Sequence, residues 1–182
     1  MNITKTDIEG VVIIEPRIFD DARGYFFESY NKQAFDREVA EVDFVQDNES
    51  CSSRGVMRGL HFQLPPYTQA KLVRCVVGRV LDVALDLRKE SKTYGQHVAV
   101  ELSSTNHRQL FIPEGFAHGF AVLSERAVFQ YKCSKYYAPM HEGGISILDS
   151  TLGIDWQVSA NEAILSEKDT RHPLLKDFNS PF

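Results

Sequence analysis

The sequence predicts a mainly β fold, an antiparallel sandwich or barrel accompanied by a few short helices. Two observations predict it. Short runs of β-branched and aromatic residues recur along most of the chain, and glycine, proline and aspartate separate them. In the first half, only residues 31–41 have the pattern of a helix, with Ser29 or Asn31 as the candidate N-cap.

The other elements of the first half are strands and turns. Residues 11–16 read as a strand that a proline ends. Residues 20–24 have the composition of a turn, and residues 25–28 are strand-like. Residues 58–63 and 69–74 are two further, consecutive strand-like segments.

A hairpin of β-branched residues follows. Residues 71–77 and 80–87 are expected to pair across the glycine turn at Gly78. Further strands are expected at residues 97–102, 109–112, 120–123 and 127–133. From about residue 161 the chain is polar with short apolar pieces, which predicts helices or turns packed onto the barrel.

Length favours a single domain spanning residues 1–182. Its barrel core is expected at roughly residues 10–158, followed by a segment of helices and turns at roughly residues 159–182. Hydrophobic residues make up 43% and charged residues 25%, as in ordinary globular proteins. The net charge of −5 argues against nucleic acid as the main partner but leaves room for a local basic pocket that holds a phosphate.

The cysteines and the hydropathy pattern indicate a compartment. Cys51, Cys75 and Cys133 are odd in number and lack metal-like spacing, so we expect no disulfide framework and a reducing, cytoplasmic environment. The first ten residues include Lys5 and Asp7 and do not resemble a signal peptide. No apolar run reaches membrane-spanning length, so no membrane association is expected.

The segments that begin at Arg58 and Lys71 place a histidine beside cations, which suits an enzyme that removes protons next to a carbonyl. A structural core histidine is the alternative for His61. Metal binding is a second alternative for His61, but Gln63 stands where a second histidine would be needed. Asp169 could orient the His61 ring only if the fold brings the two residues together. Three further histidines are too scattered to form a ligand set, so we expect no metal: His107, His118 and His141.

Strand alternation suggests where two further side chains point. Lys71 shares a strand face with Val73 and Cys75, and Tyr131 shares one with Phe129. If these apolar neighbours line the interior, Lys71 is positioned to stabilise a developing oxyanion and Tyr131 to donate a proton. The alternatives are a solvated lysine at a strand end and a tyrosine that only packs.

Groups suited to a nucleotide are also present. Arg23 and Arg58, each next to a glycine, could bind a diphosphate through bidentate donors. The chain has no glycine-rich phosphate loop or dinucleotide fingerprint, so we expect no nicotinamide cofactor. Tyr137 offers an aromatic face that either packs or stacks on a base. His118, in the glycine-rich residues 113–120, is either a packing residue or a ligand contact.

Taken together, the chain resembles the dTDP-4-dehydrorhamnose 3,5-epimerase family. The matching segments come in the family's order and cover nearly the whole chain: residues 21–28, 45–48, 58–63, 71–74, 113–120, Tyr131 with residues 136–139, and residues 165–169. The resemblance implies a cupin-like jelly roll, usually a homodimer, that epimerises C3 and C5 of a dTDP-linked 4-keto-6-deoxy sugar in dTDP-L-rhamnose biosynthesis. It implies no metal and no other cofactor.

The resemblance also implies residue roles. His61 matches the general base and Asp169 its dyad partner, Tyr131 matches the proton donor on the opposite face, and Lys71 matches the residue near the C4 oxygen. Tyr137 matches the aromatic residue that stacks on thymine. The other matches are substrate-binding positions: Arg23, Phe26, Glu28, Gln46, Asn48, Arg58, His118, Glu142 and Lys168.

One departure from the family pattern leaves its effect open. Where the family commonly has Trp-Asn-Asp, this chain has Ile147-Leu148-Asp149. The difference concerns local packing and the preference for a particular nucleotide or sugar, and no catalytic position is lost. Three other functions stay in competition: an epimerase acting at C5 or C3 alone, a metal-dependent cupin oxygenase, and a non-catalytic sugar-binding barrel. The last does not require a base, an acid and an oxyanion-stabilising cation together.

Overall fold

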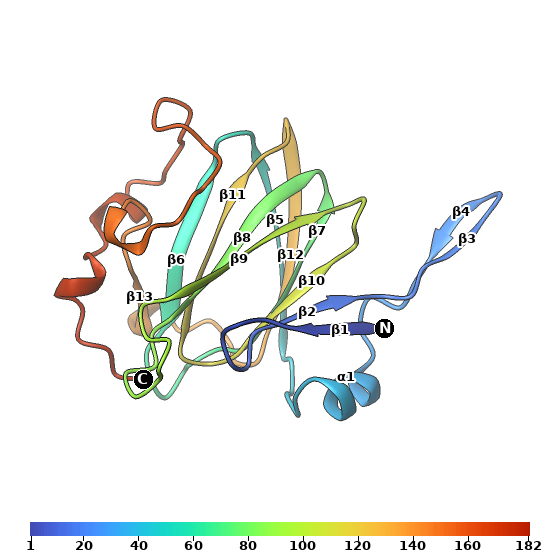
Figure 1. Cartoon of the computed structure of the whole chain (residues 1–182), viewed down its shortest axis with the longest axis horizontal. Coiled ribbons are helices and arrows are strands. Elements are labelled where there is room, and N and C mark those ends of the chain that lie inside the picture. Colours follow the sequence, from blue (N-terminus) through green and yellow to red (C-terminus); the bar gives the residue numbers. More distant parts are fainter.

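The computed structural model describes all 182 residues, and its two main antiparallel sheets confirm the expectation of a mainly β fold (Figure 1). The strands are β1 (Asn2–Lys5), β2 (Val12–Glu15), β3 (Phe19–Asp21), β4 (Gly24–Phe26), β5 (Gln46–Ser53), β6 (Met57–Gln63), β7 (Lys71–Val77), β8 (Arg79–Asp86), β9 (His97–Ser103), β10 (Gln109–Ile112), β11 (Phe116–Val122), β12 (Arg126–Cys133) and β13 (Glu142–Gly144). The helical elements are α1 (Lys32–Glu38) and the 3₁₀ turns η1 (Pro139–His141), η2 (Ser150–Leu152), η3 (Asp169–Arg171) and η4 (Leu175–Asp177).

The sheets differ in their strand order. Six strands run β1-β2-β10-β7-β12-β5, and five run β13-β6-β11-β8-β9. The two remaining strands, β3 and β4, pair only with each other and form a hairpin that projects away from the barrel (Figure 1). Neighbouring strands along the chain therefore often lie in different sheets, so the two sheets can enclose a core between them. The predicted hairpin of residues 71–77 and 80–87 is wrong for this reason: both strands exist, but β7 pairs with β10 and β12 and β8 pairs with β11 and β9, so the turn at Gly78 crosses from one sheet to the other.

Strand β8 explains how the barrel and the C-terminal segment fit together. Its even-numbered residues Val80 and Ala84 belong to the core between the sheets. Its odd-numbered residues Leu81, Val83 and Leu85 face the outside, where they belong to a second apolar cluster with the C-terminal segment. Because both faces are buried, residues 80–87 are almost continuously apolar. The expectation that the C-terminal segment packs helices or turns onto the barrel is confirmed, and those helices are 3₁₀ turns.

The predicted helix exists but is shorter than residues 31–41. Asn31, and not Ser29, is its N-cap, because the Asn31 side chain accepts a hydrogen bond from the Ala34 N–H at 3.0 Å. The helix ends at Glu38, and Phe35 is its one buried residue. Helix α1 is thus anchored through a single aromatic side chain, so its length depends on the caps more than on a long apolar face.

Other boundaries also differ from the expectations. The turn predicted at residues 20–24 is narrower, since Phe19–Asp21 and Gly24–Phe26 form its two strands. Strand β11 starts at Phe116, four residues before the predicted start. Strands β1, β3, β5 and β13 were not predicted. Strand β5 is the polar run Gln46–Ser53, which carries no hydrophobic signal but pairs along its full length with β12.

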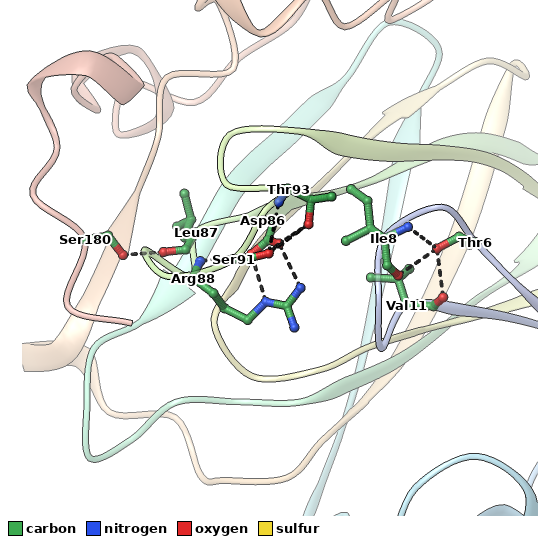
Figure 2. Close-up of polar contacts among 9 residues, drawn as sticks. All are labelled: Thr6, Ile8, Val11, Asp86, Leu87, Arg88, Ser91, Thr93 and Ser180. Atoms are coloured by element: carbon green, nitrogen blue, oxygen red, sulfur yellow. Dashed lines mark hydrogen bonds and ion pairs between the residues drawn. The ribbon is translucent and has the colours of Figure 1, made fainter.

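A buried polar cluster fixes the end of strand β8 (Figure 2). The fully buried Asp86 carboxylate accepts hydrogen bonds from the Arg88 side chain, from Ser91 at 2.7 Å and from Thr93 at 2.7 Å. Just beyond it, the Ser180 hydroxyl donates to the Leu87 carbonyl. The last residues of the chain are therefore bonded to the barrel at the point where β8 ends.

As for membranes, the structure contains no helix that is both long enough and apolar enough to span one.

Candidate active site

A cavity of about 240 Å³ lies between the two sheets at one end of the barrel. The five-stranded sheet contributes His61 from β6 and Glu142 from β13, whereas the six-stranded sheet contributes Lys71 from β7 and Tyr131 from β12. The complete lining is Gln46, Asn48, His61, Phe62, Gln63, Gln69, Lys71, Tyr131, Cys133, Tyr137 and Glu142. Seven of the sequence-predicted site residues therefore share one cavity.

Strand alternation predicted the inward side chains correctly. Val73, Cys75 and Phe129 belong to the core between the sheets, and Tyr131 packs against that core. Lys71 and Tyr131 reach the cavity from the same faces of their strands. The apolar run on each strand thus continues into a polar group where the cavity opens.

A close backbone approach brings His61 into position. A Cβ atom at Gly59 would lie 2.5 Å from the Cα of Gly119, so both positions on the paired strands β6 and β11 require glycine. This contact places His61 directly opposite His118 in the sheet.

His61 is paired with the buried Asp169. The Nε2 atom of His61 lies 2.5 Å from Oδ1 of Asp169, although the two residues are 108 positions apart in the chain. Burial raises the pKa of Asp169, but the hydrogen bond and the charge of His61 outweigh it and hold that pKa below its usual value. The carboxylate accepts the Nε2 proton, so whenever His61 is neutral its lone pair lies on Nδ1.

Lys71 and Tyr131 form the opposite wall. The Lys71 Nζ atom lies 5.9 Å from the centre of the Tyr131 ring, and neither side chain forms a hydrogen bond within the chain. Desolvation by burial lowers the pKa of Lys71, while burial raises the pKa of Tyr131 and keeps its phenol protonated. Both groups are free to contact a ligand in the cavity.

Polar side chains connect the cavity to its rim. The Tyr137 N–H donates to Gln46 at 3.0 Å, and the Gln46 amide donates to Asn48 at 2.9 Å. The Tyr137 hydroxyl donates to Glu142 at 2.6 Å, and Lys168 forms an ion pair with the same carboxylate. Burial raises the pKa of Glu142, but these two partners outweigh it and lower the pKa below its usual value.

Two predicted residues lie beside the cavity and have other partners. His118 is buried, and its Nε2 atom lies 2.9 Å from the fully buried Asp82 carboxylate. The Arg58 Nε atom donates to the Ser52 hydroxyl at 3.2 Å. Neither residue lines the cavity, although Arg58 is near enough for its charge to lower the pKa of Tyr131 in part.

Three predicted residues lie elsewhere. Arg23 and Phe26 are on the projecting β3–β4 hairpin, where Phe26 is 67% exposed and Arg23 pairs only with Asp21 (Figure 1). Glu28 follows the hairpin and accepts a hydrogen bond from Asn31. Within one chain the structure does not bring these three residues to His61.

The sequence analysis missed some lining residues. Gln63 and Cys133 could have been found, since they follow His61 and Tyr131 by two positions on the same strand faces. Gln63 also holds the loop before η1 in place, because it donates to the Tyr67 carbonyl at 2.8 Å and accepts from the Ala138 N–H at 2.7 Å. Gln69 lies in a loop, where strand alternation gives no signal.

The departure at residues 147 and 148 affects packing outside the cavity. Ile147 is buried and its carbonyl accepts a hydrogen bond from the Trp156 indole at 3.1 Å. Leu148 is 59% exposed, and neither residue lines the cavity.

Known proteins are similar to this chain in sequence and in fold. The family model described as dTDP-4-dehydrorhamnose 3,5-epimerase matches residues 5–177. A Shigella flexneri dTDP-4-dehydrorhamnose 3,5-epimerase is 55% identical over 170 residues, 93% of each chain. The crystal structure of the enzyme with that name from Elizabethkingia anophelis superposes with a TM-score of 0.93 at 50% identity, over 98% of each chain.

A ligand complex is among the similar structures. The Legionella pneumophila dTDP-6-deoxy-D-glucose-3,5-epimerase, solved with dTDP-4-keto-L-rhamnose, superposes with a TM-score of 0.94 at 47% identity, covering 98% of this chain and 94% of that chain. These likenesses confirm the cupin-like fold that the resemblance implied.

Proposed function

This chain belongs to the dTDP-4-dehydrorhamnose 3,5-epimerase family, and on that premise we propose that His61, Lys71 and Tyr131 share its proton-transfer chemistry. It is an isomerase with dTDP-4-dehydrorhamnose 3,5-epimerase activity in dTDP-L-rhamnose biosynthesis. The observation that carries the proposal for the residues is the placement of a base and an acid on opposite walls of one cavity.

The C4 ketone of the substrate acidifies the neighbouring C–H bonds at C3 and C5. The Nδ1 atom of His61 removes one of these protons, and the resulting imidazolium is stabilised by the buried Asp169 carboxylate. The Lys71 ammonium stabilises the negative charge that develops on the C4 oxygen. Burial of Lys71, which also lowers its pKa, makes this interaction stronger than it would be in water.

Inversion follows from the position of Tyr131. His61 belongs to the five-stranded sheet and Tyr131 to the six-stranded sheet, so a sugar ring held between them has one group on each face. A proton removed by His61 and replaced by the Tyr131 phenol arrives on the opposite face of the carbon. The electron pair returns to carbon and no oxidation state changes, so the reaction requires no redox cofactor.

We assign the nucleotide to the rim of the cavity. A volume of about 240 Å³ falls below the usual range for a drug-sized ligand, about 300–1,000 Å³, so the sugar fits inside and the dTDP group extends beyond it. Tyr137, which is 55% exposed, offers a ring face for thymine. Arg58 and Lys168 supply positive charge near the opening. Gln46 and Asn48 supply hydrogen-bonding groups inside.

The remaining predicted residues support a homodimer. Arg23, Phe26 and Glu28 cannot serve the cavity of their own chain because their hairpin projects away from it (Figure 1). A hairpin that pairs with no other strand and exposes Phe19 and Phe26 has little to stabilise it alone. We therefore infer that it packs against a second copy of the chain and completes the nucleotide site there. The three unpaired cysteines support the cytoplasm as the compartment.

Deuterium exchange tests the reaction. In deuterated water with dTDP-4-keto-6-deoxyglucose, we expect NMR to show deuterium at both C3 and C5 of the sugar. Both carbons flank the same ketone, and the cavity holds one base and one acid for it. Label at a single carbon would instead indicate a mono-epimerase. Absence of label at both carbons would contradict epimerisation of this substrate.

Complementation tests the contribution of the hairpin in trans. Arg23→Ala and His61→Ala variants should each have low activity alone. If both are produced in one cell, a mixed dimer has one site with an intact His61 and with Arg23 from its partner. Random pairing should restore about a quarter of wild-type activity, because half of the dimers are mixed and each has one intact site. No recovery in mixed dimers isolated with two different tags would contradict the arrangement.

A further inference from the structure

A second histidine lies behind the His61–Asp169 pair. The Nε2 atom of His172 lies 3.8 Å from Oδ1 of Asp169, and the rings of His61 and His172 are 5.6 Å apart between centroids. One ligand atom from each of the three residues lies within 4.8 Å of the others. The sequence analysis missed this group because His172 is far from every other histidine along the chain.

His172 has no hydrogen-bonding role that explains its position. Its side chain is only 12% exposed, and its Nε2 atom is buried without a partner. A buried polar atom without a partner is destabilising and calls for an explanation. The nitrogen lone pair or proton of His172 is therefore available to a group that enters between it and Asp169.

Packing fixes His172 in this position. A Cβ atom at Gly144 would lie 2.6 Å from His172 Nε2, so the ring sits directly on the glycine backbone. Gly144 is also the residue of β13 that pairs with His61 on β6. The same short strand thus determines the separation of the two imidazoles.

We propose that His61, Asp169 and His172 form an inhibitory binding site for a divalent cation such as Zn²⁺. Two imidazoles and a carboxylate are ligands that Zn²⁺ accepts at about 2.0–2.2 Å, which places any two donors no more than about 4.4 Å apart. The three donor atoms already lie within 4.8 Å. Small side-chain rotations are enough to open the His61–Asp169 contact and admit the ion.

The inhibition follows from the tautomer of His61, so it depends on the proposed role of this residue as the base. In the metal-free protein, Nε2 carries the proton that Asp169 accepts, and Nδ1 carries the lone pair. A cation on Nε2 needs the lone pair of that nitrogen, so the neutral imidazole must carry its single N–H proton on Nδ1 instead. Nδ1 can no longer accept a proton from the sugar, although the cavity itself stays open.

The proposal agrees with catalysis that needs no metal. The cation binds on the Asp169 side of His61 and takes no part in the reaction. Chelation should therefore leave full activity or raise it, if the purified protein carries traces of metal. Activity that falls on chelation and returns with a divalent metal would instead contradict both the proposed mechanism and the inhibitory site.

Metal binding is measured directly, apart from activity. We expect one Co²⁺ per chain, with the visible absorption of a low-coordinate site, and displacement of Co²⁺ by Zn²⁺ in competition with a chromophoric chelator. His172→Phe keeps a ring on Gly144 and leaves the His61–Asp169 pair intact. Loss of a residue that only supports a metal ligand typically weakens metal binding by roughly 10–100-fold. Loss of His172, a direct ligand, should weaken Co²⁺ binding at least as much. The concentration of Zn²⁺ for half-inhibition should rise by the same factor, and metal-free activity should be unchanged.

A control and a second variant complete the test. His107→Asn removes a histidine that packs against Tyr25 and Phe27, outside the proposed site, at a φ of 53° that asparagine tolerates. It should leave Zn²⁺ binding unchanged. Gly144→Ala keeps all three ligands but displaces the His172 ring, so it should also weaken Co²⁺ binding. Equal affinity in wild type and His172→Phe would overturn the site. Normal binding without inhibition would overturn the tautomer argument and would leave the site itself in place.

Discussion

Replacement of His61 by alanine should reduce kcat by about 10²–10⁴-fold, the usual contribution of a general base. The fold should survive, because His61 is 30% exposed and its one side-chain hydrogen bond is to Asp169. Thermal unfolding should show a modest loss of stability, since the buried Asp169 carboxylate loses its partner.

The matched comparison is Asp169→Ala. This variant keeps the base but loses the group that fixes its tautomer, so its kcat should fall by less than that of His61→Ala. His61→Asn separates the two effects further, since its amide can still donate toward Asp169 but cannot accept a proton from carbon. Near-normal turnover by a folded His61→Ala protein would return this residue to a structural role.

Replacement of Tyr131 by phenylalanine should separate proton removal from inversion. His61 and Lys71 stay in place, so exchange of the sugar protons with solvent can continue. Return of a proton from the opposite face requires the phenol, and formation of inverted product should fall by about 10²–10⁴-fold. The two rates are measured on one sample, as deuterium wash-in and as inverted product by NMR.

Stability provides the first control for this variant. Phenylalanine keeps the ring that packs near Phe129 and His118, and the Tyr131 hydroxyl has no partner to lose, so the melting temperature should hardly change. Tyr136→Phe is the matched substitution, because Tyr136 is a 69% exposed tyrosine outside the cavity lining. Both rates should be normal in that protein. If both are also normal in Tyr131→Phe, the proton comes from another group.

The sequence predicted those parts of the fold that have a strong local signal. Strands β7 and β8 were clear because they are rich in β-branched residues and flank Gly78. Their predicted pairing as a hairpin was wrong, because β7 pairs with β10 and β12 in one sheet and β8 pairs with β11 and β9 in the other. Strand β5 was missed because it is held by hydrogen bonds to β12 and consists almost entirely of polar residues. The predicted range of helix α1 was too long, because the end of the helix depends on capping and on tertiary contacts of Phe35.

The residues of the candidate site also fall into those that local sequence patterns predicted and those that they did not. Strand alternation was enough to direct Lys71 and Tyr131 inward, since this depends only on near neighbours. The pairing of His61 with Asp169 depends on the return of the chain after more than a hundred residues, and only the family resemblance suggested it. His172 had neither a local pattern nor a family match, so only the three-dimensional arrangement revealed it.

The bond between Ser180 and the end of β8 has a practical consequence for work with this enzyme. Besides that contact, the Lys89 N–H donates to the Phe182 carbonyl at 2.9 Å, and the Phe182 ring packs edge-on against Phe62, the neighbour of His61. Residues 180 and 182 thus pack against the end of β8 and against strand β6, which carries His61. Trimming this tail to improve crystals would remove its contacts with the end of β8 and with the strand that carries His61.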